Sequence, residues 1–266
     1  MSEEKRRERI TGQMDLSHKI VFVGGLHRSG TSLLHESLRS HPDVSGFADT
    51  GVWEDEGQHL QSVMPTARAH GGPGRFAFDP AAHLTEDSPI GTPECARQLF
   101  TEWAQYWQAD SAWWLEKSPP NLIRGRYLQH LFPEARFVMV LRHPVETALA
   151  TRKWPDSPQR LQVQLAHWFR AYDLMSSDLP HLRHVCIVRY EDFCRDPGEV
   201  LAGLSSFLDI GDRFERPTID PGATARYARM WQQMRRSPKG LVHTTMLARR
   251  YAARARVFGY DMDRFQ

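Results

Sequence analysis

Residues 21–34, VFVGGLHRSGTSLL, decide the fold of this chain. An apolar strand leads into a loop bounded by glycines, and a helix follows the loop. The glycine spacing, with Ser32 two places after the second glycine, matches the Walker-type loop G-x-x-x-x-G-K-[ST], whose backbone amides surround phosphate oxygens. Thr31 stands where that pattern has its phosphate-bridging lysine, and Arg28 offers its guanidinium from inside the loop instead. The stretch therefore predicts an anion site that lacks the lysine of an ATPase.

The segment 135–146 repeats this architecture farther along the chain. A continuous apolar strand ends in Arg142, and Pro144 begins a helix. Ligands bind at the carboxyl edge of open parallel sheets. We therefore expect Arg142 and Arg28 to face the same crevice.

Together these segments resemble the sulfotransferase family, which uses 3′-phosphoadenosine 5′-phosphosulfate (PAPS). Residues 28–32, RSGTS, are similar to the family's 5′-phosphosulfate loop, and Arg142 with Pro144 resembles the start of its 3′-phosphate motif. Residues 189–193, RYEDF, are similar to its Y-E-D-[LF] segment, whose tyrosine lies near the adenine. The resemblance extends over residues 19–208 and implies a donor site made of Arg28, Ser29, Gly30, Thr31, Ser32, Arg142 and Tyr190.

One position departs from the family pattern. Ala150 stands where the family usually has a serine, eight residues after the arginine. Thr151 follows it, but on a helix the next side chain points about 100° away. We therefore expect the 3′-phosphate to depend on Arg142 and on further donors. Three residues of the tail loosely resemble the basic-glycine loop of cytosolic sulfotransferases, namely Arg236, Lys239 and Gly240.

Lys117 is the candidate for the sulfuryl end of the donor. It follows a short apolar strand and precedes a helix that begins with proline, in the sequence EKSPP of residues 116–120. This stretch resembles E-K-[ST]-P of carbohydrate sulfotransferases, whose lysine contacts the sulfuryl group. The alternative is a structural ion pair with Glu116 or Glu146.

The catalytic base is expected to be a carboxylate. In tyrosylprotein and heparan-type sulfotransferases the base is a glutamate shortly after the stretch that matches residues 41–51, and Asp49 occupies that neighbourhood. An ionised carboxylate accepts a proton once the acceptor hydroxyl is within hydrogen-bond reach. Glu54, Glu56 and His59 are the alternatives. On a helix Asp55 and His59 would share a face, which simple surface pairing also explains.

Strand and helix patterns alternate along the chain, which predicts a parallel sheet covered on both faces. We expect a single three-layer α/β domain at residues 18–266, with the P-loop-like sulfotransferase fold that the resemblance implies, and a solvated segment at residues 1–17. Residues 64–93 are rich in glycine and proline and predict an irregular insertion, either a lid or acceptor wall or plain surface. Strands are expected near residues 19–24 and 44–47, just before Lys117, and near 135–142 and 185–188, and helices near 31–40, 93–108, 120–131, 144–154, 158–177 and beyond 224.

Composition limits the class of protein. The 266 residues carry a net charge of +2, which does not indicate a broad nucleic-acid-binding face. There is neither a signal-peptide core near the start nor an apolar run of about 18 residues, so we expect a cytoplasmic protein without a membrane span. The three cysteines, Cys95, Cys186 and Cys194, show no C-x-x-C spacing, and the histidines form no cluster, so no metal is expected. A homodimer is expected from the frequency of dimers among soluble proteins.

These observations favour a sulfotransferase that moves a sulfuryl group from PAPS to a hydroxyl of a small molecule or natural product, by in-line transfer, with 3′,5′-adenosine bisphosphate (PAP) as product. One alternative is a P-loop kinase using ATP and magnesium, which Thr31 and Arg142 disfavour because they occupy the places of its lysine and aspartate. The other is a nucleotide-binding protein without turnover, suggested by Ala150. Lys117 and Asp49 argue against it, since binding alone requires neither.

Overall fold

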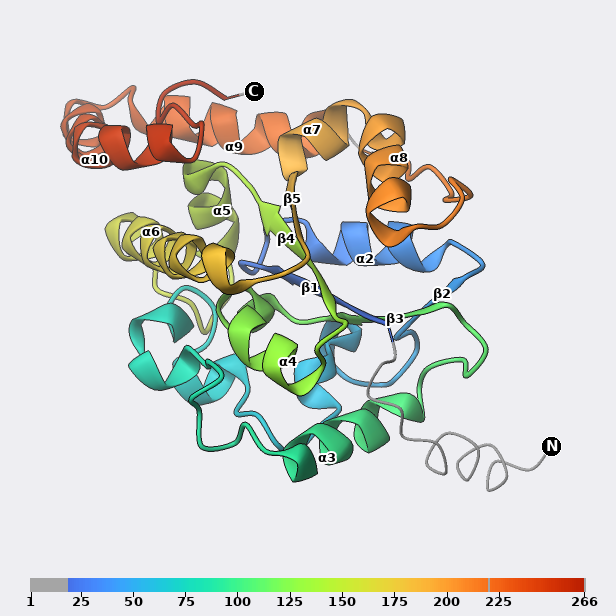
Figure 1. The fold of residues 1–266 in the computed structure, drawn as a ribbon. Helices are drawn as coiled ribbons and strands as arrows, with labels where there is room; N and C mark the ends of the chain where they lie inside the picture. The colour runs from blue at the N-terminus through green and yellow to red at the C-terminus, as the bar shows by residue number, and fades with distance from the viewer. Residues whose placement is uncertain (1–18, 220, 266) are drawn as a thin grey trace.

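A five-stranded parallel sheet forms the centre of the molecule (Figure 1). The computed structural model describes residues 19–219 and 221–265, and at residues 221–224 the backbone only. The strands are β1 (Ile20–Gly25), β2 (Val44–Gly46), β3 (Trp113–Lys117), β4 (Arg136–Leu141) and β5 (Val185–Arg189). They lie in the order β2-β3-β1-β4-β5, and every neighbouring pair is parallel. The loop after β1 therefore opens between the ends of β3 and β4.

Helices cover both faces of this sheet (Figure 1). In chain order the helices are α2 (Thr31–Arg39), α3 (Pro93–Ala104), α4 (Gly125–Leu131), α5 (Pro144–Thr151), α6 (Leu161–Asp178), α7 (Tyr190–Arg195), α8 (Pro197–Leu208), α9 (Pro221–Met234) and α10 (Pro238–Val257). Apolar residues of α2, α7 and α8 pack on one face, and those of α3, α4, α5 and α6 pack on the other. The three-layer α/β fold predicted from the sequence is thus confirmed.

β1 shows why both faces are closed. Its side chains alternate, so Ile20 and Phe22 enter one apolar cluster while Val21 and Val23 enter the other. All four are fully buried, as expected for a parallel strand covered on both sides. The central strand is therefore held by two separate cores, and the loop that follows it starts from a fixed position.

The glycine-rich and proline-rich insertion is irregular, as the sequence predicts. It contains only short 3₁₀ helices, η3 (Ala67–His70), η4 (Phe76–Phe78) and η5 (Pro80–Ala82). Phe76 and Ala77 are buried, and the backbone N–H of Ala77 donates to Nε2 of His167 in α6 at 3.2 Å. The insertion therefore packs against α6.

The tail is helical, as expected from residue 224 onward. α9 and α10 lie beyond α5 and α6 at the edge of the molecule (Figure 1). The ring of Tyr251 on α10 stacks on Phe169 of α6, with centroids 4.6 Å apart. The expected N-terminal segment, residues 1–17, lies outside the described residues. Within the described residues no helix is long and apolar enough to cross a membrane.

Truncation of Phe22 is expected to destabilise the fold strongly. Its buried ring lies 5.8–5.9 Å from the rings of Trp103, Phe132 and Phe137, so Phe22→Ala leaves a cavity that these rings cannot fill. We expect a loss of about 3–5 kcal/mol in the free energy of unfolding, measured by urea denaturation. Phe78→Ala is the control, because that ring is 44% exposed and its loss costs about 1 kcal/mol or less. Equal losses in both variants would contradict this account of the core.

Candidate active site

A cavity of about 480 Å³ opens at the carboxyl ends of β1, β3 and β4. Pockets that hold small ligands have volumes of about 300–1,000 Å³. The charged residues that line it are of both signs: Arg28, Arg39, Lys117 and Arg142, and Glu36, Glu54, Asp55 and Glu56. Because these side chains come from segments far apart in the sequence, the sheet topology assembles the site.

The loop between β1 and α2 forms one wall. Its backbone enters the left-handed region at Arg28, with φ 67°, and at Gly30, with φ 103°. A Cβ atom at Gly30 would lie 2.2 Å from Cδ2 of Tyr190, so the tyrosine ring packs directly under the loop. The loop reaches the first turn of α2 in the tight form that brings backbone amides toward one point.

Most of the loop residues predicted from the sequence face the cavity. The ones that line it are Arg28, Gly30, Thr31 and Ser32. Ser29 differs, because its N–H donates to the carbonyl of Leu26 at 2.9 Å and its side chain is fully buried away from the cavity lining. Tyr190 and Arg142, predicted from distant segments, line the same cavity.

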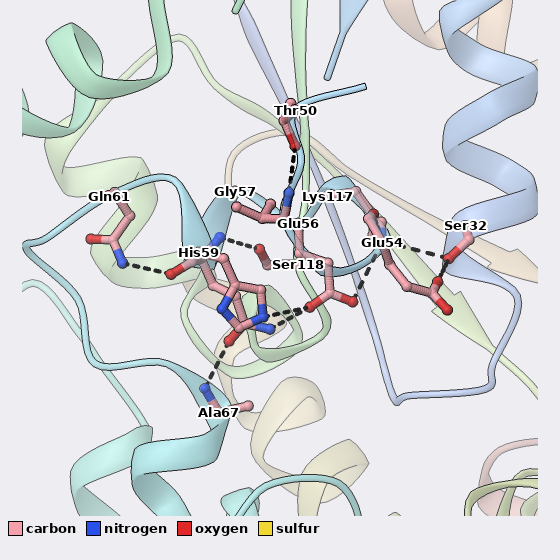
Figure 2. A network of polar contacts seen from close by, with 12 residues as sticks. Ser32, Thr50, Glu54, Glu56, Gly57, His59, Gln61, Ala67, Lys117 and Ser118 are labelled. Atoms are coloured by element: carbon pink, nitrogen blue, oxygen red, sulfur yellow. Dashed lines mark hydrogen bonds and ion pairs between the residues drawn. The ribbon is translucent and has the colours of Figure 1, made fainter. Parts of the chain in front are cut away.

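Lys117 ends β3 and is fully buried. Its ammonium donates to the carbonyl oxygen of Glu54 at 2.7 Å and to Oγ of Ser32 at 3.5 Å, and it forms an ion pair of 3.4 Å with Glu56 (Figure 2). Its ionic partner is therefore Glu56 and not Glu116 or Glu146. The lysine connects the strand edge, the start of α2 and the segment after β2.

The segment after β2 forms a second, strained wall. Asp49, Glu54 and Asp55 have φ values of 53°, 51° and 48°. The carboxylate of Asp55 accepts hydrogen bonds from the backbone and the hydroxyl of Thr50 and from the N–H of Asp49. Burial raises the pKa of Asp55, but these donors outweigh it, and the net pKa is lowered. Asp55 is thus an anchor of this turn.

The helical pairing of Asp55 with His59 does not occur. The chain forms two separate 3₁₀ turns, η1 (Trp53–Asp55) and η2 (Gly57–His59), with Glu56 extended between them. The His59 ring lies instead 3.8 Å from the carboxylate of Glu56 (Figure 2). The expected i, i+4 geometry was wrong because the segment is not an α-helix.

The candidate bases occupy different positions. Asp49, ranked first from the sequence, is exposed and is not among the residues that line the cavity. Glu54 lines it, and its Oε2 accepts a hydrogen bond of 2.5 Å from Oγ of Ser32 (Figure 2). Glu56 is buried, and burial raises its pKa although Lys117 acts in the opposite direction. His59 is absent from the lining. The geometry therefore favours Glu54.

Arg142 lies at the opposite end of the cavity, just after β4. Its Nε and one terminal nitrogen each donate to Oε2 of Glu146 at 3.1 Å, and the other terminal nitrogen donates to the carbonyl of Arg28 at 3.0 Å. Burial raises the pKa of Glu146 to about 7, although Arg142 lowers it. The guanidinium carbon lies 4.2 Å from the centroid of the Tyr190 ring. Arg142 thus adjoins both the loop and the tyrosine.

The structure also shows the surroundings of Ala150, the residue that stands where the family usually has a serine. Ala150 is buried in the core, and the hydroxyl of Thr151 donates to the carbonyl of His27, so neither lines the cavity. The ring of Tyr227 on α9 lies 5.5 Å from the guanidinium of Arg142, and two further cations lie over it, Lys153 at 4.9 Å and Arg226 at 4.8 Å.

The sequence did not indicate that Lys153, Arg226 and Tyr227 lie near Arg142, because no local pattern reports the packing of α9 on α5. Neither these three residues nor the tail donors expected from the sequence, Arg236, Lys239 and Gly240, are among the residues that line the cavity.

Two buried histidines adjoin the cations without adding charge. Burial, with Lys117 as the second cause, lowers the pKa of both His27 and His35 to about 3. Both are therefore neutral near pH 7, and the positive charge of the cavity comes from its lysine and arginines. In the described part of the chain, no group of three His, Cys, Asp or Glu residues is placed to hold a metal ion.

The insertion at residues 64–93 contributes no residue to this cavity. The segment packs against α6, and whether it is a lid, an acceptor wall or plain surface stays a prediction. Two residues of η1, Glu54 and Asp55, and Trp154 line the cavity, and the ring of Trp154 lies edge to face with Trp53 at 6.3 Å.

The family model and the curated relatives that match this chain are all sulfotransferases. A model of the sulfotransferase family matches residues 21–215. Protein-tyrosine sulfotransferase 2 of Gallus gallus is 26% identical over 199 residues, which cover 72% of this chain and 51% of the relative. Protein-tyrosine sulfotransferase 1 of Danio rerio is 25% identical over 200 residues, covering 72% and 53%. This chain thus spans about half the length of these curated relatives.

Solved structures with a similar fold include a sulfotransferase from Mycobacterium tuberculosis H37Rv, with 17% identity, a TM-score of 0.49, and coverage of 85% of this chain and 75% of that chain. A sulfotransferase from Alicyclobacillus acidocaldarius has 15% identity and a TM-score of 0.44, covering 79% of this chain and 90% of its own.

Substitution of Gly30 tests the packing of the loop. An alanine there would adopt a left-handed backbone and would also meet the Tyr190 ring. We expect Gly30→Ala to lose about 3 kcal/mol or more of unfolding free energy. Gly72→Ala also places an alanine at positive φ, 75° against 103° at Gly30, but a Cβ there has no neighbour within 4 Å, so it should cost only about 1–2 kcal/mol. Urea denaturation of both variants checks this, and a loss no greater at Gly30 than at Gly72 would refute the contact.

Proposed function

This chain belongs to the sulfotransferase family, and on that premise we propose that its cavity transfers a sulfuryl group from PAPS to a hydroxyl group of a small-molecule acceptor. One observation carries the proposal: Arg28, Lys117 and Arg142 line a single cavity around a loop that has Thr31 in place of the Walker lysine. These cations fit a donor that bears anionic groups at two ends.

The loop end of the cavity suits the reacting end of the donor. When bound, PAPS supplies the sulfuryl group and leaves as PAP. The backbone amides at the start of α2, with Arg28 and the hydroxyl of Thr31, offer hydrogen-bond donors to a 5′-phosphate, while the O–H of Ser32 is donated to Glu54. The ammonium of Lys117 stands next to Ser32 and stabilises negative charge that develops there.

The other end suits the nucleotide. Arg142 is the proposed ligand of the 3′-phosphate, and the ring of Tyr190 offers a face to the adenine. Lys153 and Arg226, which lie over Tyr227 beside Arg142, are the proposed donors that replace the serine missing at Ala150. Both residues are exposed, and the guanidinium of Arg226 donates a hydrogen bond of 2.7 Å to the hydroxyl of Tyr227, which it must give up to reach an anion.

Glu54 is the proposed general base. Its carboxylate lines the cavity and shares Ser32 with Lys117, so an acceptor hydroxyl bound beside Ser32 lies within reach of it. Glu54 then takes the acceptor proton while Lys117 and the loop hold the leaving oxygen. Glu56 compensates the buried charge of Lys117 and has no direct part in the proton transfer.

The acceptor is proposed to be a small molecule with an apolar or aromatic body. Trp154 lines the cavity, and Trp53 stands exposed beside it. Flat apolar faces of this kind suit a ring system whose hydroxyl points toward Glu54. The names of the curated relatives make a tyrosine hydroxyl the second acceptor to assay.

Binding of the donor product is the first test. Without magnesium, PAP is expected to bind with at least tenfold higher affinity than AMP or ADP, by calorimetry, because only PAP engages both ends of the cavity. Arg142→Ala should weaken PAP about 10–100-fold and leave AMP nearly unchanged, since its charge-assisted hydrogen bonds are lost.

The exposed Arg160, which does not line the cavity, supplies the control. Arg160→Ala should bind PAP like the unaltered protein. If ADP binds as tightly as PAP, and magnesium strengthens it, the sulfotransferase donor is excluded and a kinase is favoured.

The base is tested by a pair of isosteric substitutions. Glu54→Gln should lower kcat about 10²–10⁴-fold with PAP affinity unchanged, because the amide cannot accept the proton. Asp49→Asn, its matched control on the same strained segment, should change kcat less than about threefold. Turnover is followed by PAP release with a panel of phenols and alcohols. The opposite pattern, loss in Asp49→Asn alone, assigns the base to Asp49.

A further inference from the structure

α10 is attached to the molecule along only one side. Leu247, Tyr251 and Ala255 are buried, and Tyr251 stacks on Phe169 of α6. Arg254 is paired with Asp173, also of α6. One face of this 20-residue helix is thus fixed against the domain, and the opposite face points outward (Figure 1).

The outward face carries an apolar stripe. Val242, Met246 and Val257 are 60%, 65% and 81% exposed. Because successive helical residues turn by about 100°, these three side chains project from the same side of α10. Ala253, also exposed, lies between them in this projection. An amphipathic helix normally buries its apolar side chains, and α10 has apolar side chains on both its buried and its outward faces.

Cations border this stripe. Residues 221–257 contain nine lysines and arginines and no aspartate or glutamate. Lys239, Arg249, Arg250 and Arg256 are exposed and project close to the stripe. Within the described residues, none of these four forms an ion pair. The face therefore combines unpaired positive charge with exposed apolar side chains.

We propose that the outward face of α10 binds the surface of an anionic lipid bilayer. In this arrangement Val242, Met246 and Val257 enter the boundary between headgroups and acyl chains, and the neighbouring cations contact anionic headgroups. The helix lies flat on the surface, as its attachment to α6 requires. Insertion of the apolar side chains and attraction between the cations and the headgroups then both contribute to the affinity for the membrane. The stripe alone would provide only the first contribution, and the arginines alone only the second.

Other partners fit this face less well. A second copy that docked through the same face would bring the same cations against themselves, since residues 221–257 carry no carboxylate to pair with them. An acidic protein that wraps around a basic helix needs access to all sides of that helix. One side of α10 is packed on α6 and is not accessible. A nucleic acid would use the arginines but leaves the apolar stripe without a role.

Vesicle sedimentation tests this inference. The full chain should sediment with vesicles of phosphatidylcholine and phosphatidylglycerol, should bind pure phosphatidylcholine at least tenfold more weakly, and should be released at 0.5 M salt. Arg249→Gln/Arg250→Gln/Arg256→Gln should lower partitioning on the anionic vesicles about tenfold or more. Val242→Ser/Met246→Ser should also weaken it, which separates insertion from charge attraction alone.

The control keeps the net charge of the arginine variant. Arg68→Gln/Arg97→Gln/Arg160→Gln removes three exposed arginines that lie outside α10 and should partition like the unaltered protein. Circular dichroism and PAP affinity should be unchanged in all variants, which excludes misfolding.

Equal loss in the control, or no binding by the unaltered protein, overturns the inference. So does a dimer in sedimentation velocity that Val242→Ser/Met246→Ser converts to a monomer, because the face would then join two copies. Tighter binding to a DNA duplex than to anionic vesicles also contradicts it.

Discussion

The buried ammonium of Lys117 is the constraint on which the cavity depends. A charge withdrawn from water is stable only where protein groups replace its hydration. The carbonyl of Glu54, the carboxylate of Glu56 and the hydroxyl of Ser32 provide that replacement. These partners belong to the segment after β2 and to the first turn of α2, so solvating one lysine brings three separate parts of the chain to the same place. Loss of any partner leaves a buried charge short of compensation.

Backbone strain is concentrated around this same lysine. Arg28, Glu54 and Asp55 have positive φ and line the cavity, and Asp49, which also has positive φ, lies in the same segment as Glu54 and Asp55 but outside the lining. Such conformations cost about 1–3 kcal/mol each and persist only where contacts hold them. Asp55 holds one wall through its hydrogen bonds to Thr50 and Asp49. The stable sheet with its two cores supports loops that would not adopt these conformations alone.

The sequence predicted those residues of the site that lie in the loop after β1 or at the ends of strands. The strand, loop and helix around Arg28 are contiguous, and Arg142, Tyr190 and Lys117 each follow or end a strand, so parallel topology alone brings them to one edge. Glu54 lies in a 3₁₀ turn that ends where the backbone becomes extended at Glu56. The sequence does not reveal this interruption, because the spacing of Asp55 and His59 is also compatible with a continuous helix. The approach of α9 to α5 depends on tertiary packing, and hence Tyr227 with its two cations had no signal in the sequence.

Arg142 and Lys117 differ in how their charges are balanced. A guanidinium has five N–H groups, and Arg142 uses two toward Glu146 and one toward the carbonyl of Arg28, which leaves two for a ligand. The pKa of Glu146, raised by burial from 4.5 to about 7, makes this carboxyl a source of instability as the pH rises through that interval, because the unfolded chain ionises it more readily. An anion on Arg142 adds negative charge nearby and raises the pKa of Glu146 further. Proton uptake by Glu146 then relieves the repulsion, so the charge at the Arg142 end of the cavity adjusts when an anion binds there.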